Sequence, residues 1–377
     1  MDFNLTEEQQ MLQDTIARLV RDTYGFEQRE GYRESEAGFS TGFWARLGEL
    51  GLTAVPFAEE YGGMAGGGVE CQLVMTELGR GLCLEPYLHS VILGGGLIAQ
   101  LGSEAQKADL LPQVAGASLQ LAVALDEPQS HYNLHDVETH ATLDGGRWTL
   151  SGRKSVVVGG QSAGLVLVSA RTAGGSRDEE GISLFLLDPR EDGVRRRAYP
   201  TIDGRKACDL YLDKAPALLL GEPEQALAAL RYQQGRAIAA QCAEAVGSMQ
   251  AACALTLDYL KTRQQFGQPI GKFQALQHRM VDMSIELDQA TSMAILAACV
   301  ADEPDSDARS RSLAAAKFIV SRAARFVADQ SIQLHGGIGL TWEYVLSHHA
   351  KHLLMVARQF GDDDHHLQTF SRLMQVA

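Results

Sequence analysis

The sequence lacks the features that define several large classes of protein. Its longest apolar stretches are all interrupted by charge, so we expect no membrane-spanning segment. Its first ten residues, MDFNLTEEQQ, contain neither a basic stretch nor an apolar run, so we expect no secretory signal peptide. Only 33 residues are Lys or Arg against 47 Asp or Glu, and the formal charge of −14 argues against broad nucleic-acid binding.

Cysteine is also scarce and unpatterned. None of the six cysteines belongs to a CxxC pair, and they are widely spaced among apolar neighbours: Cys71, Cys83, Cys208, Cys242, Cys253 and Cys299. We therefore expect reduced thiols in a cytoplasmic protein, with neither a disulfide framework nor a zinc site. The adjacent pairs His348–His349 and His365–His366 are expected to be solvated, because neighbouring histidines rarely face one metal ion.

What is present is typical of an ordinary globular protein, with 45% hydrophobic and 21% charged residues in 377. That length allows two or three domains. Residues 1–118 are predicted to be mostly helical, starting at the Thr6 cap, with a glycine-rich loop at 61–68. Further helices in this part are predicted at 43–50, 69–82 and 105–114.

Short segments rich in β-formers follow Leu119, and they predict a sandwich or barrel. Their ranges are 119–125, 138–143, 148–152, 155–158, 165–170, 182–187 and 209–212. No GxGxxG motif opens a helix after a strand, so a doubly wound dinucleotide-binding fold is not supported. The run Arg195-Arg-Arg197 is predicted to lie in a solvated loop, with contact to an anionic ligand as the alternative.

Helical periodicity returns from residue 222 onward. It predicts helices at 222–263, 272–300, 313–334 and 342–358, and another after Asp362. The predicted domains are therefore an N-terminal helical domain (1–118), a β-domain (119–221) and a C-terminal helical domain (222–377).

Two segments of the last domain carry functional signals. Residues 259–274, YLKTRQQFGQPIGKFQ, predict a turn between helices that presents a cation, an aromatic ring and amides. Residues 333–344, QLHGGIGLTWEY, bring two glycines just past a helix end, where the backbone can approach a ligand. Either segment alone is also compatible with a simple helix turn or a glycine cap.

Together, and after a β-domain flanked by helices, these two segments resemble the acyl-CoA dehydrogenase family. The resemblance covers nearly the whole chain and implies an α+β fold: an N-terminal helical domain, a central β-barrel and a C-terminal four-helix bundle. It implies FAD as the cofactor, an acyl-CoA substrate, and an electron-transfer flavoprotein or similar electron acceptor. It also implies a homotetramer or an α2β2 heterotetramer.

By position, the resemblance assigns cofactor-binding roles to six residues. Arg263 and Phe266 correspond to residues that hold the pyrophosphate and adenosine of a neighbouring subunit's FAD, and Gln274 lies in the same strip. Gln333, Gly336 and Gly337 correspond to the loop that meets FAD from the partner chain. A forked guanidinium and free backbone N–H groups suit phosphate.

The family reaction needs a base, and here the sequence departs from the family pattern. A glutamate is expected where this chain has Phe360 or Gly361. The sequence Ala243-Glu-Ala-Val-Gly247 resembles the context of the base in branches that place it on the long helix, so we predict Glu244 as the base. The small residues around it suggest room for a ligand. Asp362 and Asp363 are second choices, more typical of a helix cap.

Two departures in the β-domain indicate a particular branch. Residues 129–133, QSHYN, replace a common Gly–Ser–Asp turn, and Val156–Val158 replace the Trp–x–Thr strip that packs on the flavin. The chain thereby resembles the branch of the pimeloyl-CoA dehydrogenase small subunit and the steroid side-chain dehydrogenases, which often pair with an unlike subunit.

The function this implies is FAD-dependent conversion of an acyl-CoA to a trans-2-enoyl-CoA, with a bulky or dicarboxylic acyl group. Two alternatives stay open. The chain could be a non-catalytic subunit that completes the FAD site of an α2β2 enzyme, or an oxygen-using oxidase or monooxygenase on the same fold.

Overall fold

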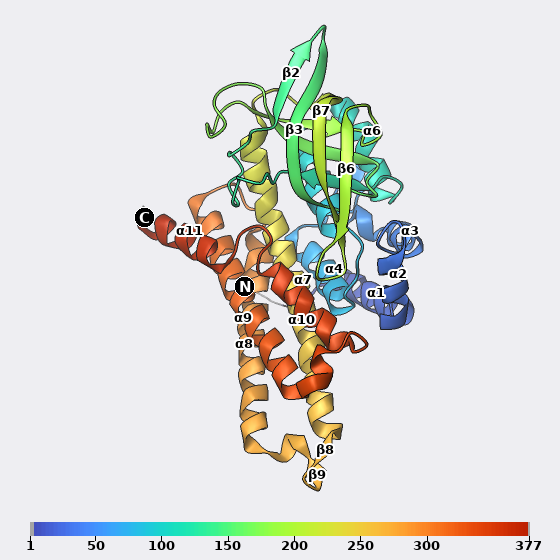
Figure 1. Ribbon diagram of the computed structural model, residues 1–377, viewed down its shortest axis with the longest axis vertical. Coiled ribbons are helices and arrows are strands. Elements are labelled where there is room, and N and C mark those ends of the chain that lie inside the picture. The colour runs from blue at the N-terminus through green and yellow to red at the C-terminus, as the bar shows by residue number, and fades with distance from the viewer. Residues whose placement is uncertain (1–3, 376–377) are drawn as a thin grey trace. The chain divides into compact units, whose positions relative to one another are not determined.

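The computed structural model describes residues 4–375, which divide into two compact units. The helical unit contains the described residues up to 31, residues 68–83 and those from 238 onward. The sheet unit contains residues 32–67 and 84–237. Along the chain, helices are followed by strands and then by helices again, as the sequence predicts (Figure 1). The boundaries of the three predicted domains stay a prediction.

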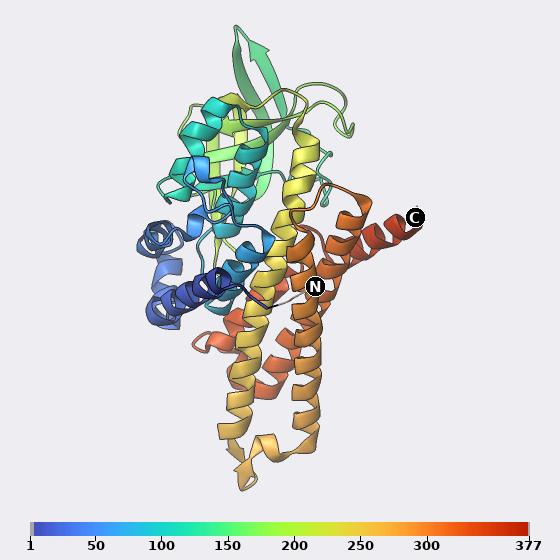
Figure 2. The same cartoon turned by 180° about the vertical axis from the view of Figure 1, so that it is seen from behind.

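Long helices dominate the helical unit, and the views in Figures 1 and 2 agree that α7, α8 and α9 run side by side. Many of their buried positions are alanines, which allow the helix backbones to approach closely. The helices are α1 (Glu7–Thr23), α4 (Gly68–Arg80), α7 (Ala226–Thr262), α8 (Gln274–Val300), α9 (Asp307–His335), α10 (Val345–Val356) and α11 (Asp363–Gln375). Residues of both α2 (Phe26–Glu34) and α7 belong partly to this unit and partly to the sheet unit.

Helix α4 crosses α7 in direct backbone contact. A Cβ atom added to Gly247 would lie 1.8 Å from the carbonyl oxygen of Thr76, and one added to Gly79 would lie 2.0 Å from the carbonyl oxygen of Glu244. The Arg80 guanidinium donates to Oε1 of Gln250 on α7 at 2.6 Å. The expectation of ligand space along the small residues of α7 is therefore wrong at Gly247, because α4 fills it.

The sheet unit holds a seven-stranded sheet and the helices α3 (Thr41–Glu49), α5 (Gly96–Leu101) and α6 (Glu104–Ala115). The strand order is β1-β4-β2-β3-β7-β5, β6 pairs with β7, and β4 also pairs with β5. Buried apolar side chains such as Leu150, Val166 and Phe185 form its core. The strands are β1 (Leu121–Ala124), β2 (His140–Asp144), β3 (Arg147–Val158), β4 (Leu165–Arg171), β5 (Ile182–Leu187), β6 (Val194–Pro200) and β7 (Lys206–Leu220).

Two strands differ from the sequence prediction. The segments predicted at 148–152 and 155–158 form one strand, β3, whose register shifts against β7 at two irregular points. The predicted loop at Arg195–Arg197 is wrong, because these residues belong to β6, which pairs with β7. Arg195 lies 3.9 Å from the ring centre of Tyr211 on β7. Three consecutive charged residues hide the strand pattern in the sequence, because β6 is exposed along most of its length.

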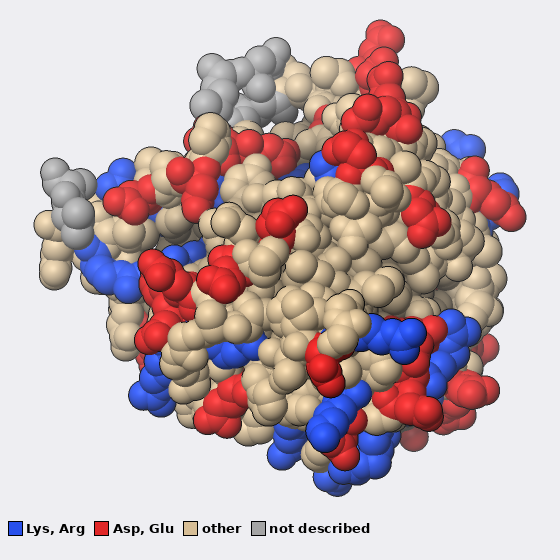
Figure 3. All heavy atoms as spheres, turned by 90° about the horizontal axis from the view of Figure 1, so that it is seen from above, with Lys and Arg blue, Asp and Glu red and all other residues tan. Residues whose placement is uncertain are grey.

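Charge is distributed without a single dominant basic surface on the face drawn in Figure 3. Acidic side chains are scattered over that face, with Lys and Arg among them. Within residues 4–375, no helix is both long enough and apolar enough to cross a membrane.

Gly247→Ala tests the helix crossing. The new methyl group would meet the α4 backbone, so we expect a loss of about 1–3 kcal/mol in the free energy of unfolding, measured with urea. Gly31→Ala is the matched control, because a Cβ there meets nothing within 4 Å inside helix α2. That control should stabilise the protein by about 0.5–1 kcal/mol. An unchanged Gly247→Ala variant would contradict the close crossing.

Candidate active site

The two predicted cofactor segments lie together in the helical unit. The ring of Tyr259, one turn before Arg263, stacks on His335 with ring centres 4.4 Å apart. His335 directly precedes Gly336, and its Nδ1 donates to the Ser331 carbonyl oxygen at 2.8 Å. Its Nε2 lies 3.2 Å from the hydroxyl of Tyr344. These contacts join the last turn of α7 to the end of α9 and to Tyr344 beyond the glycine loop.

The residues predicted to hold the cofactor are open to solvent. Phe266 is 89% exposed, and Arg263, Gln274 and Gln333 are also exposed. Within residues 4–375, the Arg263 side chain makes no hydrogen bond or ion pair. Gly336 has φ 64°, and a Cβ on Gly336 or Gly337 would meet nothing within 4 Å.

This combination fits FAD. An uncommitted guanidinium can bind a diphosphate, exposed amides can bind a heterocycle, and an open glycine backbone allows close approach. Because these groups face outward from the helical unit, they suit a cofactor shared with another subunit.

A polar network around the buried Arg29 anchors the loop from the other side, and sequence reasoning missed it. The indole of Trp342 donates to Oε2 of Glu30 at 2.9 Å, and Oε1 of Glu30 accepts from the Arg29 guanidinium at 3.0 Å. The ring of His348 donates to the Trp342 carbonyl oxygen at 2.8 Å. Burial lowers the pKa of His348. A buried arginine near the N-terminus has no pattern that would reveal a partner more than 300 positions away.

Glu244 is deeply buried on α7, with 2% of its surface exposed. Its Oε1 lies 3.9 Å from Nε2 of His352 on α10. One turn earlier, Gln241 donates from Nε2 to Oε1 of Gln359 at 2.5 Å. Gln359 precedes Phe360, where the family resemblance leads us to expect a glutamate, so this face of α7 meets the loop after α10.

That loop has a tight left-handed turn in place of a carboxylate. Phe360 has φ 57° and Gly361 has φ 105°, and a Cβ on Gly361 would lie 2.6 Å from the imidazoles of His365 and His366. Glycine is therefore required at position 361. The Phe360 carbonyl oxygen accepts a hydrogen bond from His366 at 2.9 Å, which fixes the turn.

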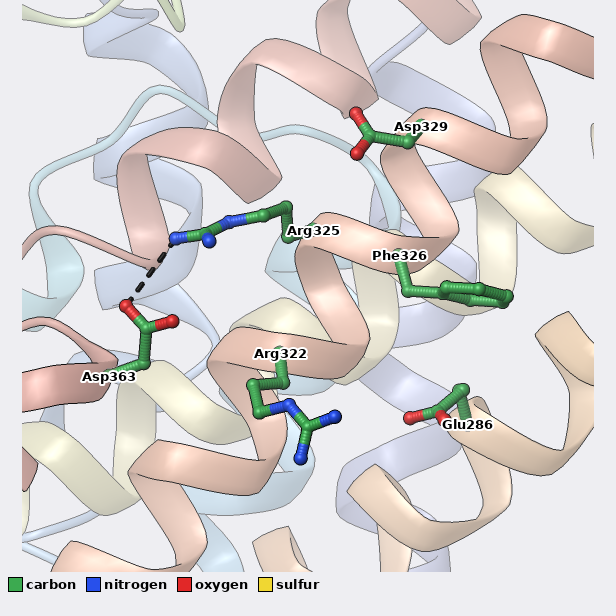
Figure 4. A pocket seen from close by; sticks show the side chains of 6 residues that line it. All are labelled: Glu286, Arg322, Arg325, Phe326, Asp329 and Asp363. Carbon is green, nitrogen blue, oxygen red and sulfur yellow. Dashed lines mark hydrogen bonds and ion pairs between the residues drawn. The ribbon is translucent and has the colours of Figure 1, made fainter. Parts of the chain in front are cut away.

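Asp362 and Asp363, the second choices for the base, lie at the start of α11. Asp362 accepts from the backbone N–H of His365 at 3.0 Å, and it pairs with Arg358 at 3.3 Å. Asp363, the first residue of α11, contacts Arg325 at 3.4 Å (Figure 4). Asp362 therefore caps the N-terminus of α11, and Asp363 pairs with an arginine next to this cap.

The prediction of solvated histidine pairs is wrong for three of the four residues. His348, His349 and His366 are buried. His349 lies 2.9 Å from the Ser248 hydroxyl, and burial lowers its pKa to about 3. Burial likewise lowers the pKa of His366 to about 3. In the described part of the chain, no cluster of three or more potential ligands could hold a metal.

A surface pocket of about 260 Å³ lies among α8, α9 and α11 (Figure 4). Its walls carry Arg322 and Arg325, but also the three carboxylates Glu286, Asp329 and Asp363. The acidic groups offset the arginines, so the pocket does not favour a phosphate. It contains none of the predicted cofactor residues.

Comparison with known proteins decides the family. Family models described as the N-terminal, middle and C-terminal domains of acyl-CoA dehydrogenase match residues 6–118, 122–215 and 229–374. The chain belongs to the acyl-CoA dehydrogenase family. This confirms the predicted family, the FAD cofactor and the class of oxidoreductase acting on acyl-CoA.

Individual relatives are similar over most of their length. A probable acyl-CoA dehydrogenase of Bacillus subtilis, YngJ, is 32% identical over 91% of this chain and 92% of its own. Mycobacterium tuberculosis FadE12 is 32% identical over 91% and 89%. The solved Tcur3481–Tcur3483 steroid ACAD has a TM-score of 0.88 at 30% identity and covers 98% of both chains. Butyryl-CoA dehydrogenase of Megasphaera elsdenii has a TM-score of 0.91 at 25% identity, with 100% coverage of both chains.

His366→Gln tests the buried histidines of this acyl-CoA dehydrogenase. At pH 5 the unfolded chain protonates His366, whereas the folded protein keeps it neutral, so stability falls as the pH drops below about 6.5. Glutamine keeps the hydrogen bond to Phe360 but does not titrate. We expect the loss of unfolding free energy between pH 7 and pH 5 to shrink by about 1–2 kcal/mol in urea titrations.

His278→Gln is the control for this comparison, because His278 is exposed on α8. It should leave the pH dependence unchanged. Equal slopes for wild type and His366→Gln would show that His366 is not held neutral by burial.

Proposed function

We propose that this chain catalyses the α,β-dehydrogenation of an acyl-CoA thioester to a trans-2-enoyl-CoA, with Glu244 as the base. The observation that carries the proposal is the hydrogen bond between Gln241 and Gln359. It ties the α7 face next to Glu244 to the loop that carries Phe360, where the family pattern has its glutamate. A carboxylate on α7 can therefore replace one on the loop without moving the reaction to another region.

Glu244 takes the Cα proton of the substrate in this mechanism. Bound FAD supplies the acceptor for the hydride that leaves Cβ. Glu244 is buried, so few water molecules compete for its carboxylate oxygens, which suits a base that takes a proton from carbon. His352 lies on the α10 side of the carboxylate, with its Nε2 3.9 Å from Oε1.

The cofactor is held by Arg263, Phe266 and Gln274 on the turn after α7, and by Gln333, Gly336 and Gly337 after α9. Their exposure supports an FAD that is shared with a second subunit. The assembly is a homotetramer or an α2β2 heterotetramer, and the two-component name of the steroid ACAD relative supports an unlike partner. An electron-transfer flavoprotein or similar protein accepts the electrons.

The acyl group is bulky, by similarity to the same steroid ACAD. The packing of α4 at Gly247 removes the earlier argument from small residues, so the relative alone supports this part. We also infer that the sheet closes into a barrel, since its pairings return through β5 to β4, and that the long helices form a four-helix bundle. A cytoplasmic location is supported by bacterial relatives such as YngJ.

Glu244→Gln tests the base. With the acyl-CoA that reduces the wild-type flavin fastest, anaerobic flavin reduction should slow by roughly 10²–10⁴-fold, because the amide cannot accept the proton. Asp362→Asn and Asp363→Asn are the matched controls and should stay within a few-fold of wild type. Reduction at the wild-type rate in Glu244→Gln would refute the assignment.

Arg263→Ala tests the cofactor strip. Loss of a charge-assisted contact to phosphate, worth about 1.5–3 kcal/mol, should weaken FAD binding by roughly 10–100-fold. Calorimetric titration of the assembled apoprotein with FAD measures this. Lys261→Ala, two residues earlier and also exposed, should bind FAD like wild type. Equal affinities for the two variants would remove Arg263 from the site.

A further inference from the structure

His335 is a buried imidazole at the junction of the two predicted cofactor segments. It is the last residue of α9, 4% of its surface is exposed, and Gly336 follows it directly. Its Nδ1 lies 2.8 Å from the Ser331 carbonyl oxygen, which can only accept a hydrogen bond, so this nitrogen carries a proton. Burial lowers the pKa of His335 and keeps the ring neutral at pH 7. Nε2 is then an acceptor, and the Tyr344 hydroxyl, 3.2 Å away, donates to it.

The glycine loop, residues 336–340, packs on His335 with one side. A Cβ added to Gly339 would lie 3.0 Å from the Cβ of His335, so the loop contacts this residue closely there. A Cβ added to Gly336 or Gly337 would meet nothing within 4 Å. One side of the loop is therefore fixed on His335, while the two glycines predicted to meet the cofactor stay open to a ligand.

Tyr259 connects His335 to the other cofactor segment. Its ring stacks on the imidazole with the ring centres 4.4 Å apart and the planes 24° apart. Its carbonyl oxygen accepts a hydrogen bond from the backbone N–H of Arg263 at 2.8 Å. The Arg263 carbonyl oxygen accepts in turn from the backbone N–H of Ile270 at 2.9 Å, which closes the turn. The backbone of Arg263 is therefore held relative to the glycine loop through one imidazole.

We propose that His335 is a positioning residue of the cofactor site: its imidazole holds the glycine loop and the Arg263 turn at the separation that lets both bind one FAD. The inference rests on the proposed cofactor strip and adds the residue that aligns its two segments. A ligand that contacts two segments binds more tightly when their separation is fixed beforehand, because ordering them costs free energy. His335 is buried, so it acts through its neighbours.

The test measures FAD binding by His335→Phe, with calorimetric titration of the assembled apoprotein. Phenylalanine keeps a ring that can stack on Tyr259 but loses both hydrogen bonds, so we expect the affinity for FAD to fall about tenfold. At saturating FAD, flavin reduction by acyl-CoA should stay within about twofold of wild type, because the substitution changes no group proposed to take part in the reaction. A general loss of structure would lower both the affinity and the rate.

A double-mutant cycle separates alignment from general destabilisation. If His335 aligns the glycine loop with Arg263, its effect on binding should largely disappear once that arginine is removed. His335→Phe/Arg263→Ala should then bind FAD within about threefold of Arg263→Ala alone. Independent effects would multiply, and the double variant would lose about a further tenfold in affinity.

Tyr344→Phe supplies a second, milder variant should His335→Phe not fold. It removes only the hydroxyl that donates to Nε2 of His335, and we expect FAD affinity to fall about threefold to fivefold. Tyr211→Phe is the matched control. It removes the hydroxyl of another half-buried tyrosine, on β7, which makes no hydrogen bond within residues 4–375, and it should bind FAD like wild type.

The outcomes separate this inference from the proposed function. If Arg263→Ala weakens FAD binding but His335→Phe and Tyr344→Phe bind like wild type, the cofactor strip stands and the positioning role is overturned. Losses that multiply in the double variant also overturn it, because they show that His335 does not act through the alignment with Arg263. If Arg263→Ala itself binds FAD like wild type, the proposed strip fails and the inference fails with it.

Discussion

Close contact between the backbones of α4 and α7 is the constraint on which the candidate active site depends. It requires glycine at positions 79 and 247, and it fixes the stretch of α7 that carries Gln241 and Glu244. With one side of this stretch sealed by α4, its polar side chains face α10 and the loop that follows. The polar groups there, such as His352, are buried and are surrounded by protein and not by solvent.

The net charge of −14 does not favour the binding of anionic ligands. FAD and CoA are both anionic, so the overall field opposes them, and binding depends on local groups. Arg263 provides an uncommitted guanidinium, and Gly336 and Gly337 provide an open backbone. The pocket of Figure 4 is a useful contrast, because its two arginines stand among three carboxylates. A count of cations alone would favour this pocket over the proposed cofactor strip.

The sequence predicts much of the fold because helical periodicity and β-rich segments are local signals. The helices from α7 to α11 and most strands follow from them. Strand β6 does not, because Arg195–Arg197 lie on an exposed strand, where hydrophobic alternation is not required. The cofactor strip is predicted from the family resemblance at fixed spacing, and it stays a prediction. The network around the buried Arg29 was not predicted, since a buried polar group is recognisable only once its distant partner is known. The small residues on α7 were misread for the same reason: sequence does not tell a helix contact from a cavity.

The central claim is that the carboxylate of Glu244 has replaced one on the loop at Phe360. A crystal structure of the FAD-loaded assembly with a non-oxidisable acyl-CoA analogue tests it most directly. The account predicts a Glu244 carboxylate oxygen within about 3–3.5 Å of the substrate Cα. A substrate Cα beyond reach of Glu244, with Asp362, Asp363 or a carboxylate of another chain beside it, would contradict the account.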